Sequence, residues 1–252
     1  MQQMCGTPLV LSLETATLGG SVCVTRAEYV LASSTGNPQV SHSNRLLQEI
    51  CECLERANVS LSDVDLFAAA SGPGSFTGLR IGIATVKALA ATLGRPCVGI
   101  PTLRAVARAA GPSRATIALL PAGRGELFAQ LLSVSPAGTV TEIDDAPAHL
   151  SPLDVIDRYG ALPNVRWAGP GAQMHRKLLT DQAQERGIEF RAEGIARTEG
   201  PQQCWTLAPE ILNLGEHVAA LSFEQWERRE VMAPTYLTAL YVRPSDAELK
   251  WQ

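Results

Sequence analysis

The chain has 252 residues, of which 46% are hydrophobic and 18% charged, and its formal net charge is -4. This composition excludes an intrinsically disordered chain, and the length allows one large domain or two smaller lobes. A protein that binds nucleic acid through phosphate contacts alone is expected to be basic, so any RNA contact here must be local or made through a partner.

The first 109 residues are patterned as a strand meander followed by alternating helices and strands. The predicted strands cover residues 9–13, 21–25, 29–32, 65–70 and 97–100. The predicted helices cover residues 43–57, 77–93 and 102–109. A glycine-rich turn, Gly72-Pro-Gly-Ser-Phe-Thr-Gly78, leads into the second of these helices, which ends before Gly94 and Pro96. The pattern predicts an α/β fold.

The second half repeats this pattern more loosely. Strands are predicted at 115–120, 126–133 and 166–168, and a helix is expected to begin near residue 172. A helical period over 207–221 predicts a further helix that packs back on the first half. We expect residues 181–203 to form a variable surface segment and the stretches 234–236 and 241–244 to be extended.

A strand, a Gly-Pro-Gly turn and a helix occur twice, with the turns at 72–74 and 169–171. Two such halves predict a duplicated α/β fold with a ligand or partner cleft between them. Chance recurrence of a three-residue turn is the alternative.

The N-terminal sequence and the spacing of the cysteines predict where in the cell the protein is located. The first eight residues contain no basic residue, and Glu14 interrupts the apolar run that follows, so we expect neither a signal peptide nor a membrane span. The cysteines form no Cys-x-x-Cys pair, and Cys51 and Cys53 are expected on different faces of a helix. The six cysteines are Cys5, Cys23, Cys51, Cys53, Cys97 and Cys204. We predict buried free thiols, a cytoplasmic location and no membrane partner.

The glycine-rich turn is a candidate nucleotide or phosphate loop. Gly72 and Gly74 would let backbone amides approach an anion, and Ser75 and Thr77 offer hydroxyls at a helix N-terminus. The turn is not a Walker loop, because no Lys-Ser/Thr pair follows at the required spacing, and it is a poor dinucleotide fingerprint. A tight strand-to-helix turn without a ligand, its hydroxyls capping the helix, explains the same residues equally well.

Polar residues also follow the first predicted strand. Glu14, Thr15 and Thr17 could hold a hydrated Mg²⁺ beside a phosphate, or the threonines could satisfy the backbone of the turn. No two of the histidines lie within helical reach of each other, and no Gly-x-Ser-x-Gly nucleophile elbow occurs. The histidines are His42, His149, His175 and His217. We therefore predict no catalytic residue and no metal site, and His42 is typical of a capping or interface residue.

Three stretches carry a family resemblance: Ser12-Leu-Glu-Thr-Ala-Thr17, Ser41-His-Ser-Asn-Arg-Leu-Leu47, and Gly72-Pro-Gly-Ser-Phe-Thr-Gly-Leu-Arg-Ile-Gly82. They resemble the TsaB (YeaZ-like) family, related to TsaD, of accessory subunits for bacterial threonylcarbamoyladenosine synthesis on tRNA. The resemblance is dense over residues 9–108 and thinner beyond. It implies an actin-like ATPase (ASKHA, ribonuclease H-like) duplicated fold of two lobes, an N-terminal lobe of residues 1–108 and a second lobe of residues 109–252.

The resemblance also implies a function. TsaD, the catalytic paralogue, carries a His-x-x-x-His metal pair where this chain has Pro101-Thr-Leu-Arg-Ala105. The chain is therefore expected to be a non-catalytic scaffold subunit that dimerises with a TsaD-type paralogue. Threonylcarbamoyl transfer to adenosine 37 of tRNAs that read codons beginning with adenine would then be carried out by the complex. ATP and Mg²⁺ would be used by the complex with a TsaE-type ATPase, tRNA would bind through the complex, and the chain alone would need no cofactor and could form a homodimer.

In the family the paralogues pair through two helices of the N-terminal lobe, here 43–57 and 77–93. The expected interface residues are His42, Leu46, Leu47, Ile50, Leu54, Arg80, Ile83 and Val86. The alternative is that the same apolar stripes face the chain's own sheet, as in ordinary amphipathic helices. The small residues Gly82, Ala84 and Ala88 would allow close helix approach on either face.

Two departures from the family weaken nucleotide binding by this chain alone. Glu14 stands where the family usually has Asp, and Pro121-Ala-Gly-Arg-Gly-Glu126 lacks the family's aspartate. Two alternative functions remain: a glycoprotease-like endopeptidase and a stand-alone actin-like nucleotide-binding module.

Overall fold

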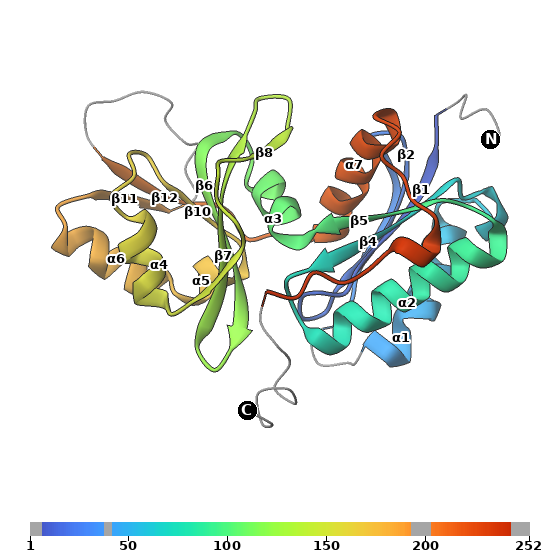
Figure 1. The fold of residues 1–252 in the computed structure, drawn as a ribbon, viewed down its shortest axis with the longest axis horizontal. Helices are drawn as coiled ribbons and strands as arrows, with labels where there is room; N and C mark the ends of the chain where they lie inside the picture. Colours follow the sequence, from blue (N-terminus) through green and yellow to red (C-terminus); the bar gives the residue numbers. More distant parts are fainter. Residues whose placement is uncertain (1–6, 38–41, 193–202, 243–252) are drawn as a thin grey trace. The chain divides into compact units, whose positions relative to one another are not determined.

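The computed structural model describes residues 7–37, 42–192 and 203–242. The chain divides into two compact units (Figure 1). Unit 1 comprises Met1–Thr102 and Asn213–Leu240, and unit 2 comprises Leu103–Leu212 and Tyr241–Gln252. Helix α3 (Thr102–Ala110) lies in unit 2 apart from its first residue, whereas the predicted lobes divide after residue 108.

Unit 1 is built on a five-stranded sheet of order β3-β2-β1-β4-β5. Its strands are β1 (Leu9–Glu14), β2 (Ser21–Arg26), β3 (Tyr29–Thr35), β4 (Leu66–Gly72) and β5 (Cys97–Pro101). The first three pair antiparallel, and β1, β4 and β5 pair parallel. The helical elements of the unit are α1 (His42–Arg56), η1 (Leu61–Asp63), α2 (Phe76–Leu93), α7 (Leu214–Glu227) and η2 (Pro234–Tyr236).

The ends of α2 follow from its sequence. The Ser75 hydroxyl accepts a hydrogen bond from the Gly78 amide at 3.2 Å and caps the helix N-terminus. Gly94 ends the helix in the left-handed conformation, at φ 62°, which a glycine adopts without steric cost. By length and apolar composition α2 could cross a membrane, but core helices of soluble proteins pass the same test, and six of its residues are buried.

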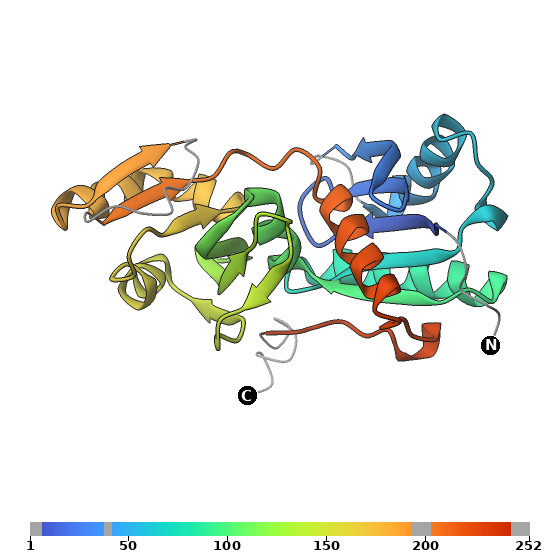
Figure 2. The same ribbon diagram turned by 90° about the horizontal axis from the view of Figure 1, so that it is seen from above.

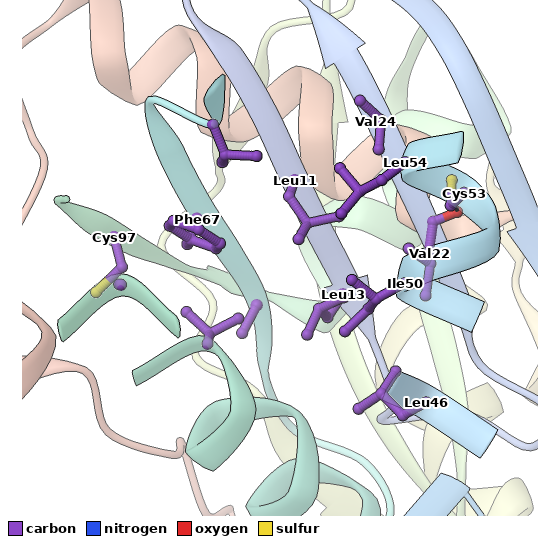
Figure 3. Packing of buried hydrophobic residues seen from close by; sticks show 14 of the residues in the cluster. Leu11, Leu13, Val22, Val24, Leu46, Ile50, Cys53, Leu54, Phe67 and Cys97 are labelled. Carbon is purple, nitrogen blue, oxygen red and sulfur yellow. Dashed lines mark hydrogen bonds between the residues drawn. The ribbon is translucent and has the colours of Figure 1, made fainter. Parts of the chain in front are cut away.

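Helices cover both faces of the unit 1 sheet. Side chains from alternate positions of β1 and β2 meet apolar residues of α1 and α2 in one core cluster (Figure 3). The labelled residues of that cluster are Leu11, Leu13, Val22, Val24, Leu46, Ile50, Cys53, Leu54, Phe67 and Cys97. On the other face, α7 contacts β1, β2, β4 and β5 (Figure 2), and the Ser12 hydroxyl donates to the Gly215 carbonyl at 2.8 Å.

Unit 2 is built on a larger sheet of order β11-β12-β10-β6-β7-β8, with β9 paired to β7. Its strands are β6 (Ser113–Gly123), β7 (Glu126–Val134), β8 (Val140–Glu142), β9 (Ala148–Leu150), β10 (Arg166–Ala168), β11 (Glu189–Ala192) and β12 (Cys204–Leu207). Besides α3, its helices are α4 (Pro152–Tyr159), α5 (Pro170–Met174) and α6 (Arg176–Glu185). Trp167 and Trp205 meet edge to face at 5.1 Å within its core.

The two units share one strand pattern. In each, a central strand (β1 or β6) pairs antiparallel with its successor and parallel with a later strand (β4 or β10). That later strand leads into Gly-Pro-Gly and a helix, at residues 72–74 in unit 1 and 169–171 in unit 2. The repeated motif therefore occupies equivalent positions in the two units, which confirms the predicted duplication of an α/β fold.

The end of the chain differs most from the sequence prediction. The helix expected at 207–221 is α7, which begins at Leu214, whereas Leu207 is the last residue of strand β12. The stretch 181–203 includes the end of α6 and strand β11, and its residues 193–202 lie outside the described residues. Residues 234–236 form η2 rather than an extended strand, and residues 243–244 also lie outside the described part.

Candidate partner interface and glycine-rich loop

The glycine-rich loop packs against the corner that follows β1. Because β1 and β4 are adjacent parallel strands, the turns that leave them lie at the same edge of the sheet. The Ser75 amide donates to the Ala16 carbonyl at 2.8 Å, and the Thr15 hydroxyl donates to the Gly78 carbonyl at 2.8 Å. The two turns are therefore clamped together by their own hydrogen bonds.

The glycines are required by this packing. A Cβ atom at Gly74 would lie 2.5 Å from the Ala16 carbonyl oxygen, and one at Gly78 would overlap the Thr15 carbonyl oxygen. Gly72 has φ 116°, and a Cβ atom there would overlap the Leu240 carbonyl oxygen. The close approach of the chain's own backbone thus explains why glycine stands here, without a phosphate.

The polar side chains of the predicted nucleotide loop also bond within the chain. The buried Glu14 carboxylate accepts hydrogen bonds from the Thr17 amide at 2.8 Å and the Thr17 hydroxyl at 2.6 Å. Ser75 caps α2, while Thr77 is exposed in its first turn. Nucleotide binding at these residues stays a prediction. Among the described residues, no group of three or more His, Cys, Asp or Glu side chains is placed to hold a metal.

We expect Thr15→Val to lower the free energy of unfolding by about 1 kcal/mol, the usual net value of one buried hydrogen bond. Valine keeps the shape of threonine but cannot donate to the Gly78 carbonyl. Urea unfolding followed by far-ultraviolet circular dichroism measures this loss. A variant as stable as the wild type would contradict the clamp between the two turns.

Five of the eight predicted interface residues lie in the core of unit 1. All are at most 8% exposed, because their side chains pack on the sheet of the same unit. They are Leu46, Ile50, Leu54, Ile83 and Val86. The assignment of these five to a partner surface is therefore corrected: they are core residues of this chain.

The outward sides of the same helices carry a different set of residues. Leu47 is 66% exposed on α1, and the Arg80 guanidinium lies 3.7 Å from the centroid of the Phe76 ring on α2. We call five of the exposed residues of these helices the α1–α2 outer face: Leu47, Cys51, Arg80, Ala84 and Ala88. His42 is the first residue of α1, and its side chain lies outside the described part.

The cysteine prediction holds for four of the five described residues, and Cys5 lies outside the described part. Cys23, Cys53, Cys97 and Cys204 are buried free thiols, whereas Cys51 is exposed on α1. Cys51 and Cys53 do lie on different faces of the helix, and the expectation that Cys51 is buried was wrong. Burial raises the pKa of the thiols of Cys23, Cys53 and Cys97, so these side chains are neutral at physiological pH.

Comparisons with known proteins agree with this fold. A family model described as TsaD, tRNA N6-adenosine threonylcarbamoyltransferase, matches residues 33–165, more than half of the chain. The solved structure of YeaZ from Pseudomonas aeruginosa matches with a TM-score of 0.70 and 25% identity over 93% of this chain and 99% of that chain.

Two curated relatives match over shorter stretches. The tRNA threonylcarbamoyladenosine biosynthesis protein TsaB of Escherichia coli (strain K12) is 34% identical over 123 residues, 47% of this chain and 52% of that protein. A tRNA N6-adenosine threonylcarbamoyltransferase of Rhizobium johnstonii is 41% identical over 114 residues, 42% of this chain and 30% of that protein. The match thus spans about half the length of the first relative and less than a third of the second. The chain is a TsaB/YeaZ-like member of the TsaD family, with the duplicated actin-like, ribonuclease H-like fold.

Proposed function

We propose that the chain acts in threonylcarbamoyladenosine synthesis on tRNA as the non-catalytic partner of a TsaD-type protein. The similarity to relatives named as TsaB biosynthesis proteins supports the pathway. The segment Pro101-Thr-Leu-Arg-Ala105 supports the non-catalytic role, because it contains neither histidine of the pair that the resemblance assigns to the catalytic paralogue.

The exposed apolar residues of the α1–α2 outer face are the observation that carries the proposal. Leu47 projects from α1, and Cys51 follows one turn later. On α2, which contacts α1, the small side chains of Ala84 and Ala88 leave room for a partner helix to approach closely. These side chains would give a partner helix apolar contacts that the chain's own core does not use.

The other components follow from this role. ATP and Mg²⁺ would be used by the complex, which includes a TsaE-type ATPase, and this chain would need no cofactor of its own. The tRNA phosphates would be bound mainly by the TsaD-type partner, because this chain has a net charge of -4. Such a complex works in the cytoplasm, where tRNA is modified.

A pairing experiment tests the surface. We expect Leu47→Asp combined with Ala84→Asp to weaken binding to the TsaD-type protein by about 30-fold or more, because an interface would have to desolvate two unpaired carboxylates. Isothermal titration of the two purified full chains measures the affinity. Leu153→Asp is the matched control, since Leu153 is 55% exposed on α4 in unit 2, and it should bind like the wild type. Unchanged affinity of the double variant would place the interface elsewhere.

A reconstituted modification assay tests the role itself. With the TsaD-type partner, the ATPase, ATP, threonylcarbamoyl-adenylate and tRNA present, the wild type should support modification, and the double variant should lose activity in step with its affinity. Modification at full rate without this chain would contradict the proposal. In the part of the chain that the structure describes, no specific observation favours the endopeptidase or the stand-alone nucleotide-binding module.

A further inference from the structure

Strand β10 of unit 2 carries a buried arginine in the interior of the sheet. Arg166 is 7% exposed, and β10 pairs with β6 on one side and β12 on the other. Trp167, the next residue, packs in the core on the opposite face of the sheet. Charged side chains are seldom buried to this degree unless they are paired, so the surroundings of Arg166 need an explanation.

The cross-strand neighbours of Arg166 are polar and uncharged. They are Thr116 on β6 and Thr206 on β12, which lie on the same face because register partners share a face. Thr116 is fully buried, and its hydroxyl has no hydrogen-bond partner among the described residues. The Thr206 hydroxyl donates to the Val165 carbonyl at 3.4 Å.

Within the described part of the chain, no hydrogen bond or ion pair of the Arg166 guanidinium is found. Its Nε atom is buried without a hydrogen bond, and within the described residues Arg166 makes no ion pair with a carboxylate. Arg191, on the same face of the outermost strand, is by contrast paired with Glu189 at 2.7 Å. Burial lowers the pKa of Arg166, because it takes the charged guanidinium out of water.

We propose that Arg166 and Thr116 bind a small oxyanion, a free phosphate group or carboxylate, on this face of the unit 2 sheet. The guanidinium presents several N–H donors in a fixed planar fork that matches two oxygens of such a group. The Thr116 hydroxyl can donate to a further oxygen. Such an anion would supply the counter-charge and the acceptors that these buried groups lack.

Urea unfolding of the full chain at constant ionic strength tests the site, with inorganic phosphate or acetate replacing chloride. The unfolding equilibrium constant of the wild type should fall about elevenfold when the free anion is at ten times its Kd. Arg166→Met should remove this response and should be at least as stable as the wild type in chloride, because it takes away an unpaired buried charge. The salt that lowers the unfolding equilibrium constant of the wild type more, phosphate or acetate, identifies the anion.

Two controls separate the site from general salt effects. Phosphate stabilises folded proteins by exclusion from their surface, so only the difference between the wild type and Arg166→Met counts. Arg191→Met removes a half-exposed, paired arginine from the same face and should keep the wild-type response. Equal responses of the wild type and Arg166→Met to both anions would overturn the proposal.

Two further variants keep the test decisive. If Arg166→Met fails to fold, Arg166→Lys replaces it, since lysine keeps the positive charge but lacks the planar fork of N–H donors. The affinity of Arg166→Lys for the anion should be at least about tenfold lower than that of the wild type. An unchanged affinity would overturn the proposal. Glu193→Gln combined with Glu199→Gln tests a carboxylate of this chain as the counter-ion. A response to phosphate that appears only in this variant would overturn binding of a free anion.

Discussion

Replacing Gly78 with alanine is expected to destabilise the chain by about 3 kcal/mol, although alanine in a helix interior is normally more stable than glycine by roughly 0.5–1 kcal/mol. The reason is that a Cβ atom at this position of α2 would overlap the Thr15 carbonyl oxygen. That oxygen belongs to the backbone beside β1, so it cannot rotate away as a side chain could. Urea unfolding followed by far-ultraviolet circular dichroism measures the loss.

Gly82 on the same helix provides the matched control. A Cβ atom there would overlap the Thr15 hydroxyl oxygen, which belongs to a side chain. Thr15→Ala should therefore recover part of the stability lost by Gly82→Ala but none of that lost by Gly78→Ala. A Gly78→Ala variant more stable than the wild type would show that the loop does not contact the corner at Thr15. Ligand binding would then be the better explanation for the glycines of the loop.

The glycine-rich turn shows what could be predicted from the sequence. Gly72, Pro73 and Gly74 break regular structure locally, so the turn and the helix after it were predicted correctly. The partner that requires Gly74 and Gly78 is the corner at residues 14–17, about 60 residues earlier in the chain. Local patterns carry no information on so distant a contact, and the phosphate and packing interpretations therefore remained equal.

The helix faces show a second limit. The period of α1 predicted an apolar stripe, but Leu46 and Leu47 are neighbours with the same side chain, and only one of them is buried. Burial is decided by the sheet on which the helix packs. Leu237, from the chain's last described segment, completes the same core, and its carbonyl accepts a hydrogen bond from the Lys87 ammonium at 3.0 Å. No local pattern predicts this contact.

Short elements of unit 2 were the hardest to predict. Strand β12 has four residues, of which only Leu207 fell within the predicted helix, and the other three were assigned to no element because so short a run fits either period. Strands β8 and β9 have three residues each and contain too few positions to establish an alternation. Their pairing with β7 is what makes them strands.

Val86→Asp is expected to cost about 4 kcal/mol or more, a large part of the stability of an ordinary domain. Val86 is fully buried between α2 and the unit 1 sheet, so the introduced carboxyl would lack water and partners. Ala84→Asp is the matched control on the exposed side of the same helix. It should cost less than about 1 kcal/mol, chiefly the lower helix propensity of aspartate.

The pH dependence of this pair distinguishes burial from a local helix effect. Burial raises the folded-state pKa of the introduced carboxyl above its unfolded value of about 4, so the deficit of Val86→Asp is largest at neutral pH. It should shrink as the pH falls toward that unfolded value, while the deficit of Ala84→Asp should stay nearly constant. Chemical unfolding at several pH values measures both. A Val86→Asp variant that folds as stably as Ala84→Asp would place Val86 on the surface and make it available to a partner, as the sequence alone suggested.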